Sequence, residues 1–271
     1  MITSTQWQLA REAAERYEQI LVPAILGPAA QALANWAEPG EGETVLDVGC
    51  GTGVAARFAA EKVGASGRVI GIDVNAGMIE VARSLSTING TAIEWYENNA
   101  CQLPLEDQEV DLVLCAQSLQ FMTDRRSALA EMHRVLKPDG RAALSLWCDI
   151  QENPYFHALT ETIARHISQD TAAGLMAIFG LSKANEIRSV LSEAGFHSIK
   201  MKVQQLNLAL PKLKDFVPRH IIATPMAAGF NAASPLVQVK VIQEVAERLE
   251  LYTTESEVCI PFRTHLVLAR K

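Results

Sequence analysis

The chain has 271 residues, 49% of them hydrophobic, and a net charge of −7 from 24 basic and 31 acidic residues. This length and composition predict one large α/β domain with additions, or two modest domains. A mildly acidic chain lacks the basic surface of a nucleic-acid-binding protein, and no stretch approaches the roughly 18 apolar residues of a membrane helix, so we expect neither a nucleic-acid partner nor stable membrane insertion.

The N-terminal part of the sequence predicts two helices. Residues 5–21 place apolar side chains on one face of a helix. Pro23 and Pro28 predict a break before a second helical segment over 29–37, and residues 39–42 read as a loop.

Strands and helices then alternate along the chain. The apolar runs and periodicities predict strand 44–48, helix 54–62, strand 68–73, helix 76–86, strand 92–97, strand 110–115, helix 124–137 and strand 141–147. Such alternation is typical of a parallel sheet with helices on both faces. The polar stretch 101–109 is too short for a long helix, so we expect a shorter crossover there.

The pattern changes after residue 147. Residues 151–180 are helical in parts, a helix over 181–194 ends at Gly195, and 197–210 alternates as a long strand. A polar, proline-marked stretch precedes a helix over 235–249, and the chain ends on a strand over 258–270. We therefore expect an N-terminal helical cap (1–40), a core (41–150), a helical insertion (151–180), and the C-terminal part of the core (181–271) with a helical lid insertion at about 211–257.

The residues that follow or end two of the predicted strands are typical of a ligand-binding site. The strand 44–48 runs into a turn with glycine at 49, 51 and 53, and the strand 68–73 ends on Asp73. A glycine turn lets backbone N–H groups approach a ligand closely, because no Cβ intervenes. An acid at the next strand end is placed to bind the hydroxyls of a ribose. Together they predict a nucleoside-binding α/β domain.

The spacing of the glycines favours one nucleoside over another. Dinucleotide folds use G-x-G-x-x-G, whereas here the third glycine comes one residue early. Asp47, just before the turn, disfavours a pyrophosphate and favours a cationic amino-acid head group. The ligand that fits is S-adenosylmethionine (SAM), although a nicotinamide-dependent oxidoreductase stays open as the alternative.

The segment 46–53 (Leu-Asp-Val-Gly-Cys-Gly-Thr-Gly) resembles motif I of the class I SAM-dependent methyltransferases. Residues 70–82 resemble their second motif, 99–104 (Asn-Ala-Cys-Gln-Leu-Pro) their third, and 111–115 and 131–140 complete the series. The match covers roughly residues 40–147, and its first motif is similar to the ubiquinone/menaquinone and small-molecule branch. Where the third motif usually begins with aspartate, this chain has Asn99, whose side-chain oxygen can also accept a hydrogen bond.

The resemblance implies a Rossmann-like, seven-stranded, mostly parallel sheet with helices on both faces and an antiparallel last strand. In the family the last two strands are joined by a short turn, so the long segment between them here is expected to be a lid. The resemblance also implies that Asp73 binds ribose, Met78 packs on adenine and Asn99 accepts from the adenine amino group. Tyr17 is expected either to close over the methionine end of the cofactor or simply to pack its helix.

The predicted site residues follow from these motifs. The cofactor-binding set is Asp47, Gly49, Cys50, Gly51, Asp73, Val74, Met78, Asn99, Ala100, Ala116, Gln117 and Tyr17. The substrate-pocket set is Gln120, Phe121 and Trp147.

The expected reaction is in-line transfer of the SAM methyl group to O, N or C of a small, partly apolar metabolite, leaving S-adenosylhomocysteine. Alignment alone lowers such a barrier by roughly 7–11 kcal/mol. His157 is the candidate general base, His166 and His220 are further candidates, and His133 is expected to be structural. A non-catalytic SAM-binding protein is the second alternative.

Two further expectations concern the chain as a whole. The cysteines, at positions 50, 101, 115, 148 and 259, form no C-x-x-C pair, and the N-terminus shows no secretory signal. We therefore expect a reduced, cytoplasmic setting. The six histidines lack metal-ligand spacing, so we expect no metal, and a monomer or a homodimer.

Overall fold

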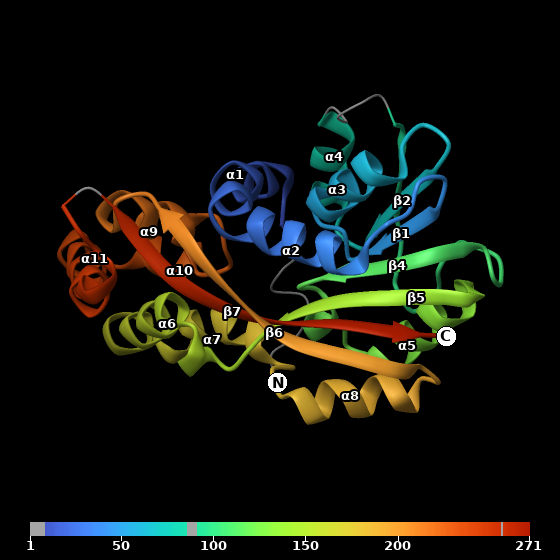
Figure 1. Cartoon of the computed structure of the whole chain (residues 1–271). Coiled ribbons are helices and arrows are strands. Elements are labelled where there is room, and N and C mark those ends of the chain that lie inside the picture. Colours follow the sequence, from blue (N-terminus) through green and yellow to red (C-terminus); the bar gives the residue numbers. More distant parts are fainter. Residues whose placement is uncertain (1–8, 86–90, 256) are drawn as a thin grey trace.

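The computed structural model describes residues 9–85, 91–255 and 257–271. In this part of the chain the core is a seven-stranded sheet in the order β3-β2-β1-β4-β5-β7-β6 (Figure 1). The strands are β1 (Thr44–Val48), β2 (Arg68–Asp73), β3 (Ile93–Glu97), β4 (Val110–Ala116), β5 (Leu136–Trp147), β6 (His197–Leu210) and β7 (Val258–Arg270). Strands β1 to β5 run parallel, and β7 runs antiparallel between β5 and β6. The predicted Rossmann-like sheet with an antiparallel last strand is confirmed.

Helices cover both faces of this sheet. On one face, α2 (Gly27–Ala37) and α3 (Val54–Val63) pack on Val45 and Leu112. On the other face, α5 (Arg125–Val135) and α8 (Ala184–Glu193) pack on Leu46 and Val113. Val45 and Leu46 are neighbours on β1, so the alternation of side chains along a strand divides the core into two layers.

The strand order reverses at β1, which lies between β2 and β4. From β1 the chain crosses to β2 on one side of β1. After β3 it returns to β4, which lies on the other side of β1. Open α/β sheets bind ligands at the carboxyl ends of the strands at this point. The loop from β1 to α3 and the loop from β2 to α4 (Ala76–Ser84) both open at that edge.

The N-terminal helices are continuous, so the predicted break at Pro23 and Pro28 was wrong. A π-helical turn, η2 (Val22–Leu26), joins α1 (Arg11–Leu21) directly to α2. The N–H of Gly27 bonds to the carbonyl of Val22, five residues back, and this wider turn accommodates prolines that would break a regular helix. Residues 5–8 of the predicted first helix, and residue 86 of the helix predicted over 76–86, lie outside the described residues.

This long helix also contradicts the expectation that no stretch of the chain is apolar enough for a membrane helix. An 18-residue window within Arg11–Ala37 has a mean hydropathy of 1.3, which by length and composition suffices for a membrane-crossing helix. The buried core helix of a globular domain passes the same test, and 56% of this window is buried inside the protein. Its residues Ile20, Leu33 and Ala34 all belong to the buried interior.

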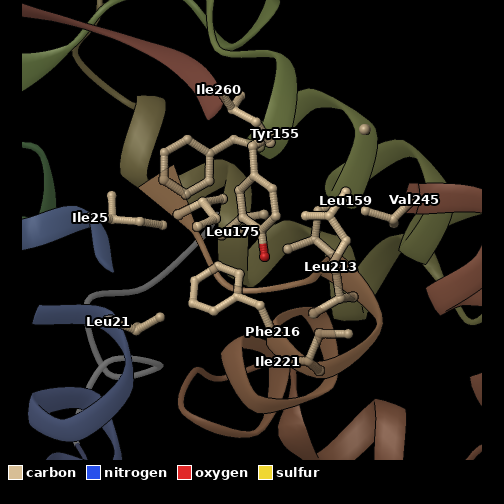
Figure 2. Packing of buried hydrophobic residues seen from close by; sticks show 14 of the residues in the cluster. Leu21, Ile25, Tyr155, Leu159, Leu175, Leu213, Phe216, Ile221, Val245 and Ile260 are labelled. Atoms are coloured by element: carbon tan, nitrogen blue, oxygen red, sulfur yellow. The ribbon is translucent and has the colours of Figure 1, made fainter. Parts of the chain in front are cut away.

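Additional helices gather at one end of the sheet. They are η5 (Ile150–Glu152), α6 (Pro154–His166), α7 (Gln169–Met176), η6 (Ala177–Phe179), α9 (Leu213–Ile222), α10 (Ala227–Ala232), α11 (Pro235–Arg248) and η7 (Glu250–Tyr252). One buried cluster joins α1, α6, α7, α9 and α11 to the ends of β6 and β7 (Figure 2). The domain boundaries at residues 40, 150 and 180 stay a prediction.

Candidate active site

A cavity of about 420 Å³ lies where the sheet meets the additional helices. One side is formed by the turn after β1, the end of β2, the start of α4, and the loops after β3 and β4. The other side is formed by α1, η2, α6, α7, η6 and α9. Every predicted cofactor and pocket residue except Asp47 lines this cavity. The cavity therefore brings together residues as far apart in the sequence as Tyr17 and Thr224, both outside the segment that the motifs cover.

The glycine turn needs a backbone that other residues avoid. Gly49 has φ of +67°, and a Cβ at that position would lie 2.6 Å from Ser118 Oγ. Gly51 has φ of +55°, and the nearest atom to its hypothetical Cβ is the Tyr17 hydroxyl at 3.9 Å. Gly49 therefore allows β1 and the loop after β4 to approach each other, whereas Gly51 leaves open space on the cavity side.

Asp73 is the acid at the centre of this half of the cavity. Its Oδ2 accepts the N–H of Gly51 at 2.8 Å, and its Oδ1 accepts the N–H of Asn75 at 2.8 Å. Burial raises the pKa of Asp73, and the N–H bonds act in the opposite direction. Since the two carboxylate oxygens have four lone pairs in all, the group can accept a ligand hydroxyl in addition to these N–H groups. A ribose diol fits this arrangement.

Asp47 is placed differently from what the sequence suggested. The residue is 0% exposed and does not line the cavity. Its Oδ2 accepts the N–H of Ala56, in the first turn of α3, at 3.0 Å, and its Oδ1 has no hydrogen-bond partner among the described residues. Burial raises the pKa of Asp47 to about 7. The carboxyl therefore holds α3 against β1 from beneath the turn, and its charge acts on the cavity through space.

The predicted adenine contacts lie on the cavity wall. Met78 is buried in α4, whose first turn is capped by Asn75 through the Met78 N–H at 3.0 Å. Asn99 Oδ1 already accepts the N–H of Cys101 at 2.9 Å, so part of its role is to fix the turn after β3. A second lone pair on that oxygen is left for a ligand.

Two glutamines after β4 face the middle of the cavity. Gln117 has φ of +52°, uncommon for a residue other than glycine, and its amide nitrogen donates to Thr264 Oγ1 at 2.9 Å. The amide nitrogen of Gln120 donates to the Gln117 carbonyl at 2.8 Å. Both amide oxygens are buried with no hydrogen-bond partner among the described residues.

The far end of the cavity is apolar and aromatic. The Trp147 and Phe156 rings meet edge to face with centroids 5.4 Å apart, and Phe156 meets Phe179 at 5.6 Å. Aliphatic side chains from α1, η2, α7 and η6 complete this end: Leu21, Ile25, Leu26, Leu175 and Ile178. This lining suits a partly apolar molecule.

The candidate histidines differ in whether they line the cavity. His157 was the wrong candidate base, because it lies outside the cavity lining and its Nε2 pairs with Glu161 Oε1, one turn along α6, at 3.1 Å. His166 pairs with Glu244 of α11 at 2.6 Å and is also outside the lining. His220, by contrast, lines the cavity, is 2% exposed, and has its Nδ1 3.1 Å from the Tyr155 hydroxyl.

Sequence reasoning missed several of these residues. Tyr155, Phe156 and Thr224 carried no role in it, because residues 151–180 were predicted only to be helical in parts and residues 211–257 only to form a lid. His133 lies edge to face on Phe196, with centroids 5.2 Å apart, on the side of α5 that packs on α8. This agrees with the structural role expected for it.

Comparisons with known proteins match the same region. A family model described as a methyltransferase domain covers residues 45–140. The chain is 32% identical over 171 residues to the ubiquinone/menaquinone biosynthesis C-methyltransferase UbiE of Xanthomonas campestris, covering 53% of this chain and 68% of that protein. It is 29% identical over 182 residues to the chloroplastic 2-phytyl-1,4-beta-naphthoquinone methyltransferase of Arabidopsis thaliana, covering 60% and 68%. Against the 2-phytyl-1,4-naphtoquinone methyltransferase of Nostoc, the 38% identity spans 41% of this chain and about half (49%) of that one.

Solved structures share the fold. The YcgJ protein of Bacillus subtilis superposes with a TM-score of 0.59 at 20% identity, covering 90% of this chain and 97% of that one. The phosphoethanolamine N-methyltransferase 2 of Haemonchus contortus, solved with phosphomonomethylethanolamine and S-adenosylhomocysteine, gives a TM-score of 0.60 at 17% identity, covering 100% and 60%. The region that the family model matches contains the glycine turn, Asp73 and Asn99.

Proposed function

The chain belongs to the class I SAM-dependent methyltransferases, in their quinone-methyltransferase-like branch, and we propose that its acceptor is a reduced quinone or a closely similar hydroxylated aromatic molecule. SAM is the cofactor of this family, and it supplies a methyl group activated by the sulfonium. The residues present fit that group. Asp73 lines the cavity and its carboxylate can accept a ligand hydroxyl beside the N–H groups it already binds, and Gly51 leaves the space that a side chain would fill.

The observation that carries the proposal is the continuity of the cavity. The same space is lined by Gly51 and Asp73 at one end and by Trp147 and Phe156 at the other. A molecule at the aromatic end therefore faces a cofactor at the strand ends without an intervening wall. Two of the relatives are named for quinone methylation, one as a 2-phytyl-1,4-beta-naphthoquinone methyltransferase and one as a ubiquinone/menaquinone biosynthesis C-methyltransferase.

The chain's own residues supply alignment and exclusion of water. Leu21 and Ile25 close the cavity from the N-terminal helix, and the rings of Trp147 and Phe156, in contact with each other, form an apolar wall against which a planar acceptor would pack. Reduction of a quinone to a hydroquinone makes its ring carbons electron-rich. Once aligned, such a carbon would form its bond to the methyl as the S–CH3 bond breaks and S-adenosylhomocysteine leaves, and the same carbon would then lose its proton to solvent.

A methyl-transfer assay tests the proposal. The purified protein is incubated with SAM and a 1,4-naphthoquinol or a 1,4-benzoquinol kept reduced, and the product is examined by mass spectrometry and NMR. We expect a mass gain of one methylene group, with the new methyl on a ring carbon, and an equal amount of S-adenosylhomocysteine. The oxidised quinone is the matched control, and it should not react.

A thermal-shift measurement separates cofactor binding from acceptor choice. SAM and S-adenosylhomocysteine should raise the melting temperature, whereas NAD(P) should not. A protein that binds SAM but methylates neither quinol would overturn the acceptor proposal and favour a different acceptor. A shift with NAD(P) alone would favour the oxidoreductase alternative.

A further inference from the structure

We propose that His220 and Gln120 form an oxygen-binding subsite for the methyl acceptor, in which His220 donates a hydrogen bond and Gln120 accepts one. The inference rests on the proposed function, because it names the groups that recognise the acceptor. Both residues line the cavity, and both are nearly inaccessible, with 2% and 5% exposure.

His220 is held by Tyr155. The Tyr155 hydroxyl in α6 lies 3.1 Å from Nδ1 of His220 in α9, across 65 residues of sequence, and the two rings lie 5.3 Å apart. Figure 2 shows the hydroxyl of Tyr155 pointing toward the helix that carries Leu213, Phe216 and Ile221. Tyr155 is 0% exposed, so its hydroxyl is sealed in an apolar environment.

The hydrogen bond fixes the tautomer of the imidazole. Burial raises the pKa of Tyr155 well above its ordinary value, so the phenol keeps its proton. A buried hydroxyl proton needs an acceptor, and among the described residues Nδ1 of His220 is the one at hydrogen-bond distance. The O–H therefore donates to Nδ1, and the neutral imidazole carries its own proton on Nε2.

The same environment argues against His220 as a general base. Burial lowers the pKa of His220 to about 3. No carboxylate of the described residues bonds to either ring nitrogen, and the surrounding groups are the rings of Tyr155, Phe156 and Phe216. An imidazolium would have no counter-ion, so the ring remains neutral and acts as a donor.

The Nε2–H is available to a molecule in the cavity. His220 lines the cavity, and none of the hydrogen bonds among the described residues involves its Nε2. A carbonyl or phenolate oxygen of the acceptor is the partner that this N–H would bind. Such a bond would fix the position of that oxygen and so align the ring carbon with the methyl group.

Gln120 supplies the complementary group. Its amide nitrogen donates to the Gln117 carbonyl, which can only accept, so the orientation of the amide is determined. The amide oxygen is buried without a partner among the described residues. A ligand O–H would satisfy it, and leaving such a group unpaired is unfavourable. Together the two residues select a molecule that has both a hydroxyl and a carbonyl or phenolate oxygen, as the monoanion of a hydroquinone does.

Kinetics of four variants with the quinol test the subsite. His220→Phe and Gln120→Met each remove one polar atom, and we expect each to raise KM for the quinol by about tenfold, which corresponds to the loss of one hydrogen bond. His220→Gln retains an N–H near the position of Nε2 and should restore most of the affinity. His157→Gln, outside the cavity, is the matched control and should behave as the native protein. SAM affinity and melting temperature, measured for all four, identify any variant that has lost its fold.

A second test changes both the residue and the substrate and compares the four binding affinities. A quinol analogue in which one oxygen is replaced by hydrogen should bind more weakly than the quinol to the native protein. If His220 contacts that oxygen, the two compounds should bind equally to His220→Phe, as measured by calorimetry with S-adenosylhomocysteine present.

The outcomes separate this inference from the proposed function. Absence of quinol binding to the native protein would overturn both. Methylation of quinols by the native protein, with unchanged KM in His220→Phe and Gln120→Met, would overturn the subsite alone. An ionisation near neutral pH in kcat that disappears in His220→Gln would show a base and overturn the assignment of His220 as a donor.

Discussion

The backbone N–H of Gly51 donates a 2.8 Å hydrogen bond to Oδ2 of Asp73, so the turn after β1 and the end of β2 are joined directly. The two elements of the nucleoside site are therefore coupled before any ligand arrives. The N–H of Asn75 binds the other oxygen and fixes the carboxylate plane. Preorganisation of this kind reduces what binding must order.

Asp73→Ala should weaken SAM binding by about 1–3 kcal/mol, because the hydrogen bonds to ribose are lost and the Gly51 N–H loses its partner. Isothermal calorimetry measures the change. Asp139→Ala removes an equal charge from an exposed position and should leave the affinity unchanged. Equal SAM affinity in Asp73→Ala and the native protein would place the ribose elsewhere.

Gly51→Ala should abolish most SAM binding, because a side chain would enter the space that faces the cavity. Strain contributes too, since Gly51 has φ of +55°. Gly64→Ala separates the two effects, because Gly64 has φ of +67° and its hypothetical Cβ meets no atom within 4 Å. Both variants should lose similar stability in urea, and only Gly51→Ala should lose SAM affinity. Similar SAM affinity in the two would mean that the turn does not face the cofactor.

Asp47 should couple SAM binding to proton release. Its pKa in the free protein is raised from 3.8 to about 7 by burial, and the sulfonium and ammonium of SAM favour the ionised form. SAM affinity should therefore rise with pH and level off above about 7, where the carboxyl is already ionised. Calorimetry in buffers of different ionisation enthalpy measures the released proton. S-adenosylhomocysteine, which lacks the sulfonium, should show a shallower dependence, and Asp47→Asn should show almost none.

The Asp47 carboxyl also makes the stability of the fold depend on pH, in the direction opposite to that of most carboxylates. Because the folded pKa of Asp47 lies above its unfolded value, its contribution to stability is present at low pH and is lost as the pH rises through about 7. This carboxyl therefore opposes the usual gain of stability that carboxylates show on ionisation. A pH-independent SAM affinity in the native protein would contradict the coupling to SAM, and an equal pH dependence of the free energy of unfolding in the native protein and Asp47→Asn would contradict the effect on folding.

The sequence located the cofactor half of the site because its signals are local. Residues 44–48 and 68–73 read as apolar strands, and the observed strands have the same bounds because a short apolar run ending in a glycine turn leaves little freedom. Asp73 and Gly51 are close in space because adjacent parallel strands end at the same edge. The strand 197–210 was equally clear from its alternation.

The half of the cavity assigned to the methyl acceptor could not be predicted from local signals in the sequence. The contact between Tyr155 and His220 joins two helices that pair only in the folded chain, and neither local segment carries a sign of it. The bounds of α9 and α10 could not be predicted, because Pro218 lies inside α9 in a stretch that reads as polar. The burial of Asp47 also depends on the packing of α3, so its residue type suggested a direct ligand contact that the structure does not provide.

The π-helical turn gives a stability prediction that opposes helix propensity. Gly27 has φ of −61°, an ordinary helical value, so propensity alone predicts that Gly27→Ala stabilises the helix by about 1 kcal/mol. The hypothetical Cβ, however, lies 2.7 Å from the Val22 carbonyl oxygen, which is backbone and cannot turn away. We expect the clash to dominate and Gly27→Ala to lower the free energy of unfolding by about 1–3 kcal/mol in urea.

Gly40→Ala is the control for this variant, because the three atoms nearest to its hypothetical Cβ all belong to the Glu43 side chain, at 3.3 Å and beyond, and none of them is backbone. The turn also carries Ile25 and Leu26, which line the acceptor end of the cavity. If the helix relaxes to relieve the clash, these side chains shift. Gly27→Ala should then raise KM for the acceptor while SAM affinity changes little. A variant that is more stable than the native protein would show that the wide turn is not required by the packing around it.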